Sequence, residues 1–80
     1  MIVLSGLILI EIKYRDNIGK KDIAGLEPFM DRFDVETGII VTRDKLDLNG
    51  SGDRRILRIP VWLFLLMDEK DLADLSKMKD

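Results

Sequence analysis

The sequence has no cysteine and no histidine among its 80 residues. Without thiols it cannot form disulfides or thiolate metal sites, and without imidazole it cannot build a histidine-ligated zinc centre or a Ser-His-Asp site. It also lacks a charge excess: 13 basic and 15 acidic side chains give a net charge of −2. Any polyanion must therefore bind to a local patch. An apolar content of 46% excludes intrinsic disorder.

Long hydrophobic runs are missing as well. Residues 1–10 are apolar except for Ser5 and Gly6, which is far short of the ~20 residues that a membrane-spanning helix needs. Residues 61–67 are shorter still, and the basic start typical of a signal peptide is absent. We therefore expect one small domain over residues 1–80, located in the cytoplasm and not inserted in a membrane.

Residues 7–13, with the sequence LILIEIK, are predicted to form a strand. Both faces are apolar before Glu11, which is typical of a strand covered on both sides. From Glu11 onward the pattern alternates, and this places Glu11 and Lys13 on one face and Tyr14 on the other.

Residues 20–33 carry apolar side chains at three- and four-residue steps, which predicts an amphipathic helix. Pro28 lies inside this pattern and removes one backbone hydrogen bond. We therefore expect a kink, or a break near Glu27.

The second half of the chain adds two strands and helical segments. Residues 38–42 are a β-branched run and residues 55–59 alternate apolar and basic side chains, so both are predicted to be strands, the second ended by Pro60. The apolar residues 61–67 could be a strand or a helical turn, and the preceding proline favours the helix. Residues 71–79 are predicted to form a polar helix. The order of elements predicts an α/β fold with one crossover helix, a parallel strand pair, and a peripheral helix or frayed tail after residue 67.

The most informative pair is Glu11 and Lys13 at the end of the first strand. A spacing of two residues puts the carboxylate and the ammonium on one face, about 7 Å apart along the strand. A carboxylate there can bind a divalent cation, and a lysine beside it can orient water for attack on a phosphodiester. The more common meaning of such a pair is that the strand emerges into solvent.

A resemblance to a known family extends across residues 7–66 and rests on four segments in order: Glu11-Ile12-Lys13-Tyr14-Arg15, Lys20-Lys21-Asp22, Gly38 to Thr42, and Ile59 to Leu66. In this order they resemble the C-terminal domain of unknown function of archaeal and bacterial AAA-type ATPases, a restriction-endonuclease-like domain of the PD-(D/E)XK superfamily. The resemblance implies an α/β fold with a mixed sheet, one crossover helix and a C-terminal helix. It also implies a magnesium-dependent phosphodiesterase site, with Glu11 as the second metal-binding acid and Lys13 as the lysine.

The sequence departs from that family before Glu11. The family takes its first acid from a preceding β-hairpin, whereas no acidic residue precedes Glu11. We therefore expect a truncated nuclease-like domain without the hairpin, inactive alone. No P-loop motif is present, so nucleotide hydrolysis is not expected.

Basic residues near the pair suggest a nucleic-acid contact. Arg15, Lys20 and Lys21 could line a groove that follows a DNA backbone. Interleaved Asp16 and Asp22 favour the alternative, a solvated surface of mixed sign. Three other arginines would join such a groove only if the fold brought them there: Arg54, Arg55 and Arg58.

Residues 47–53 begin like a calcium-binding loop. The position that requires a bidentate glutamate is Arg58, so an ordinary polar turn is expected instead.

The missing hairpin would leave one edge of the strand at residues 7–13 bare, and residues 61–67 need more cover than a short chain supplies. We therefore expect a homodimer or higher homo-oligomer, formed by continuation of the sheet or by exchange of the N-terminal strand. The alternative function is a non-catalytic interaction module that uses this edge and the Trp62 segment to bind a partner, for example an AAA-type ATPase.

Overall fold

The computed structural model describes residues 1–48 and 54–77, with only the backbone described at residues 76 and 77. Residues 49–53 of the calcium-like loop lie outside the described part. The elements follow in the order β1 (Ile2–Ser5), β2 (Ile8–Ile12), α1 (Lys20–Phe33), β3 (Thr37–Thr42), β4 (Arg55–Pro60), α2 (Val61–Phe64) and α3 (Glu69–Lys77). The predicted α/β class is confirmed.

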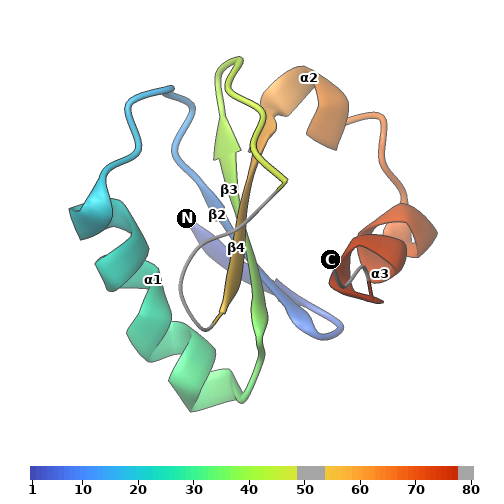
Figure 1. Cartoon of the computed structure of the whole chain (residues 1–80). Helices are drawn as coiled ribbons and strands as arrows, with labels where there is room; N and C mark the ends of the chain where they lie inside the picture. The colour runs from blue at the N-terminus through green and yellow to red at the C-terminus, as the bar shows by residue number, and fades with distance from the viewer. Residues whose placement is uncertain (49–53, 78–80) are drawn as a thin grey trace.

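The four strands form one mixed sheet in the order β1-β2-β3-β4. β1 runs antiparallel to β2, whereas β2, β3 and β4 are mutually parallel. The helix α1 covers one face of this sheet, and α2 and α3 lie on the other (Figure 1). Because both faces are covered, the strand β2 is buried on both sides, as its apolar run predicts.

The prediction of a bare edge at residues 7–13 is wrong. β1 pairs with β2 over four residues, from Ile2 opposite Glu11 to Ser5 opposite Ile8. The two strands are joined by a two-residue turn that starts at Gly6, which has a φ of 60°. In the sequence this turn is marked only by Ser5 and Gly6 within the otherwise apolar residues 1–10. Residues 2–12 thus form a hairpin that contains the strand of Glu11, and its other strand, β1, supplies no carboxylate.

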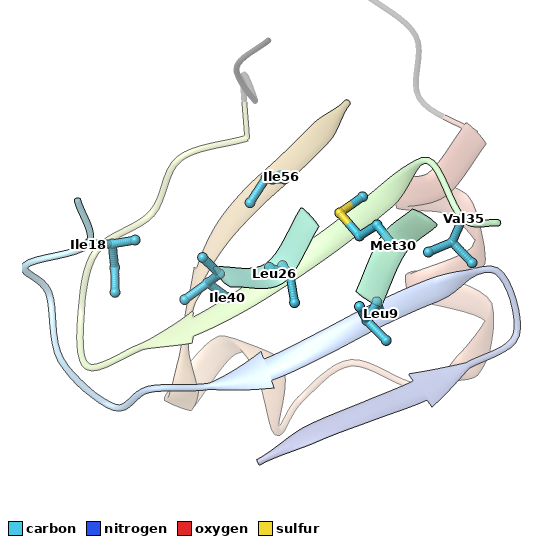
Figure 2. Close-up of a cluster of buried hydrophobic side chains, with 7 residues drawn as sticks. All are labelled: Leu9, Ile18, Leu26, Met30, Val35, Ile40 and Ile56. Atoms are coloured by element: carbon cyan, nitrogen blue, oxygen red, sulfur yellow. The ribbon is translucent and has the colours of Figure 1, made fainter. Parts of the chain in front are cut away.

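Two apolar clusters fill the space on either side of the sheet. Between α1 and the sheet lie Leu9, Ile18, Leu26, Met30, Val35, Ile40 and Ile56 (Figure 2). On the opposite face lie Ile8, Ile10, Ile39, Val41, Leu57 and Ile59. The helix α1 approaches β3 closely at Gly38, where an added Cβ would lie 3.0 Å from Cδ2 of Leu26. This contact fixes the helix against the sheet.

The helix α1 is continuous from Lys20 to Phe33, so the break expected near Glu27 is not found. Pro28 is exposed, and so is Ala24, whose carbonyl loses its hydrogen bond to the missing proline N–H. That carbonyl can be hydrated, because this side of the helix faces water.

The segment after β4 is only partly covered. Its helical turn α2 ends at Phe64, and Trp62, Leu65 and Leu66 are 54%, 76% and 76% exposed. The helix α3 begins two residues earlier than predicted, at Glu69. No helix in the described part of the chain has the length and apolar character to cross a membrane.

Candidate functional site

The charged site lies at the carboxyl end of β2, beside the first turn of α1. The Nζ atom of Lys13 is 3.4 Å from Oε1 of Glu11, so the two side chains share one face as predicted. The Glu11 side chain is 13% exposed. Ligands of α/β sheets characteristically bind outside the carboxyl ends of parallel strands, which is where this pair is placed.

The local backbone explains why the strand stops at the pair. The amides of Lys13 and Tyr14 both donate to the carbonyl of Val41, each at 3.0 Å. Tyr14 has a φ of 53°, in the left-handed region, so it does not continue the predicted alternation. Its ring instead lies 6.0 Å from the guanidinium carbon of Arg43. The chain is thereby turned out of the sheet and toward α1.

A second carboxylate, that of Asp22, approaches the pair from α1. Its Oδ1 atom lies 3.7 Å from Nζ of Lys13 and pairs with the guanidinium of Arg15. Its Oδ2 atom accepts a hydrogen bond of 2.9 Å from the amide of Gly19, at the start of the helix. The sequence identified Asp22 only as an acid interleaved with the basic residues, because its closeness to Glu11 depends on where α1 packs.

Two carboxylates therefore flank one ammonium group, which we call the Glu11–Lys13–Asp22 cluster. Magnesium commonly binds through one or two carboxylates and keeps several water ligands, so the two acids fit a weak cation site. No group of three or more potential acidic ligands that could hold a metal occurs among residues 1–48 and 54–77. The residue opposite Glu11 on β1 is Ile2, which is not acidic.

A separate ion pair, between Arg58 and Asp47, lies on the same face of the sheet. Arg58 follows Glu11 and Ile40 in one cross-strand row. Its Nη1 atom is 3.3 Å from Oδ2 of Asp47, and its Nη2 atom donates to the carbonyl of Ile18 at 3.4 Å. The guanidinium of Arg58 is therefore bound to residues outside the Glu11–Lys13–Asp22 cluster.

The predicted basic groove is not assembled as one surface. Arg15 is paired with Asp22, whereas Lys20 and Lys21 are exposed on the first turn of α1. Arg54 is paired with Asp31, in the second half of α1. Arg55 begins β4 and its register places it on the face opposite α1. The described basic side chains thus form a surface of mixed sign.

The carboxylate of Asp16 connects the loop after β2 with the loop after β3. Oδ1 of Asp16 accepts hydrogen bonds from the amides of Asp44 and Lys45, at 2.6 and 2.8 Å. These bonds hold the pKa of Asp16 below its ordinary value, and the Gly19 amide, together with Arg15 and Lys13, does the same for the pKa of Asp22.

Acid should therefore destabilise the fold through these carboxylates. Because the folded-state pKa of Asp22 lies below its ordinary value of 3.8, its stabilisation is present above that pH and is lost as the pH falls further. We expect Asp22→Asn to lower the free energy of unfolding by about 1 kcal/mol at pH 6 and by much less at pH 2.5. Urea unfolding at the two pH values measures this, with the exposed Asp74→Asn as the matched control. An equal loss at both pH values would contradict the assignment.

Comparison of the chain with protein-family models, with curated proteins and with solved structures found no match.

Proposed function

We propose that this chain is a nuclease-related α/β domain whose Glu11–Lys13–Asp22 cluster binds a divalent cation weakly, and which does not cleave nucleic acid efficiently on its own. The observation that supports it is the position of the Lys13 ammonium within 4 Å of both carboxylates at the carboxyl end of β2. Two acids and a lysine are also the set of side chains that the resemblance to the PD-(D/E)XK superfamily implies for metal-assisted phosphodiester hydrolysis.

The same contacts argue for low activity. The ammonium of Lys13 occupies the position between the acids, and Arg15 competes for Asp22. A cation must displace these contacts before it can bind, and only two carboxylates are available to hold it. We therefore assign the site an affinity for Mg²⁺ on the order of 1 mM in the absence of a phosphate ligand.

The test is a Mn²⁺ titration followed by paramagnetic broadening of backbone amide signals. We expect selective broadening at residues 11–13 and 19–22, lost in Glu11→Gln, while Asp31→Asn, an equal charge change farther along α1, leaves it intact. Plasmid incubated with the protein and Mg²⁺ or Mn²⁺ should stay uncut. Absence of broadening at these amides would refute the cation site. Efficient cleavage that is abolished by Glu11→Ala would refute the proposal that the domain does not cleave nucleic acid efficiently on its own.

A second candidate function is a non-catalytic interaction module. A large apolar area is exposed in α2 and directly after it, at Trp62, Leu65 and Leu66. Such areas are typical of surfaces that bind other proteins. Under this alternative, Trp62→Ala and Leu66→Ala weaken partner binding, and Glu11→Gln leaves it unchanged. The two functions thus differ in which residues carry them.

A further inference from the structure

The outer edge of the sheet at β1 has none of the features that usually prevent association of strands. β1 has the sequence IVLS, with no charge and no proline, and Val3 and Leu4 are 42% and 43% exposed. Natural edge strands are normally protected by charged side chains, proline or a covering segment. In the described part of the chain no strand lies beyond β1. In Figure 2 it forms the lower border of the sheet.

The opposite edge, at β4, is protected in all three ways. The amide and the carbonyl of Arg58 are both bonded to Asp47, each at 2.8 Å, which covers the middle of the strand. Arg55 adds a charge at its start, and Pro60 at its end has no N–H to donate. Association through the sheet is therefore restricted to one edge of the molecule. An interface that uses one edge of each copy closes after two copies instead of growing into a fibre.

The hydrogen bonds between β1 and β2 determine which groups of this edge are available. The amide of Ile12 donates to the carbonyl of Met1, so these two residues form a hydrogen-bonded pair. Along an antiparallel hairpin, hydrogen-bonded pairs alternate with pairs that share no hydrogen bond. With Val3 opposite Ile10, the peptide groups of Val3 face β2. Those of Ile2 and Leu4 point away from β2, into the space beyond the edge.

These outward groups match a second copy of themselves. When two β1 strands pair in antiparallel orientation about Val3, Ile2 of one copy lies opposite Leu4 of the other. Both residues present N–H and C=O outward, so four hydrogen bonds form without any change in the strand. The half-exposed Leu4 side chains would lie beside Ile2 of the other copy, and both leave water.

We propose that two copies of this chain associate through β1, centred on Val3, to form one continuous eight-stranded sheet. The occupant of the edge is a second copy of this chain. The expected dimer is weak, with a dissociation constant on the order of 10–100 µM, because only four residues of each strand take part.

The test exploits the direction of the peptide groups. Leu4→Pro removes an N–H that β2 does not use, so the hairpin is kept and the two intermolecular bonds donated by Leu4 are lost. The matched control is Leu4→Ala, which shortens the side chain but keeps the N–H. Sedimentation equilibrium at increasing concentration should show wild type moving from 9.2 kDa to twice that mass. We expect Leu4→Pro to raise the dissociation constant at least about tenfold more than Leu4→Ala does.

Amide hydrogen exchange identifies the interface itself. In the wild type, the amides of Ile2 and Leu4 should become more protected as concentration rises, while the amide of Val3 is protected at all concentrations. A 9.2 kDa species at every concentration up to about 1 mM would overturn the proposal. So would a dimer that Leu4→Pro leaves intact, or an assembly that grows beyond two copies. Circular dichroism of Leu4→Pro checks that the variant is folded before the comparison is made.

Discussion

Combining Leu26→Ala with Gly38→Val should cost far less stability than the sum of the two single changes. Leu26 is fully buried, and its truncation leaves a cavity that lowers the free energy of unfolding by about 3 kcal/mol. Gly38→Val forces a side chain into Cδ2 of Leu26, only 3.0 Å from the added Cβ, and costs about 2 kcal/mol. In the double variant the valine fills the space that the leucine vacates, and the contact with Sδ of Met30, 3.2 Å from the added Cβ, remains, so we expect a coupling of about 1 to 2 kcal/mol.

Chemical unfolding of the four proteins measures this cycle. Leu66→Ala is the control for loss of a leucine side chain, because Leu66 is 76% exposed and its truncation should change stability by less than about 0.5 kcal/mol. Additive effects of the two changes would mean that α1 does not rest on β3 at Gly38. The position of Asp22 beside Glu11 would then lose its support, since α1 carries Asp22 to the cluster.

Removal of the Lys13 charge should strengthen cation binding, although a lysine is one of the three side chains of the cluster. Its ammonium lies 3.4 Å from Glu11 and 3.7 Å from Asp22, and so contacts both carboxylates to which we propose that a divalent cation binds. In Lys13→Met the ammonium that contacts both carboxylates is removed, and only the Arg15 guanidinium remains paired with Asp22. We expect this variant to bind Mg²⁺ at least about fivefold more tightly than wild type, equivalent to about 1 kcal/mol.

Isothermal titration with Mg²⁺ at low ionic strength gives the two affinities. Lys21→Met is the matched control, because Lys21 is an exposed lysine on the first turn of α1 and its removal changes the net charge equally. If both variants gain affinity to the same extent, the effect is one of overall charge and Lys13 does not compete for the site. Weaker binding by Lys13→Met would contradict the account more directly.

The sequence alone predicted the parts of the fold that depend on local pattern. The helix over residues 20–33 was located by its apolar periodicity, and the three strands after Gly6 by apolar runs, β-branched content or alternation. The placement of Glu11 and Lys13 on one face follows from the same periodicity, and the ion pair confirms it.

The hairpin and the second acid could not be predicted in this way. The turn at Gly6, which has a positive φ, lies inside an apolar run where Ser5 and Gly6 are the only sequence signal. Asp22 is eleven residues from Glu11, and its place in the cluster depends on the packing of Leu26 and Met30 against the sheet. Tertiary contacts of this kind leave no trace in periodicity. An acid in the first turn of a crossover helix is therefore a candidate partner for charged side chains at the end of the preceding strand.

Anomalous diffraction from crystals soaked in Mn²⁺ tests the central claim most directly. The account predicts an anomalous peak between the carboxylates of Glu11 and Asp22, with the Lys13 ammonium moved out of that position, and no such peak in Glu11→Gln. An undisturbed Lys13 in contact with both acids, with no manganese between them at a concentration well above 1 mM, would show that the cluster is a structural ion-pair network and not a cation site.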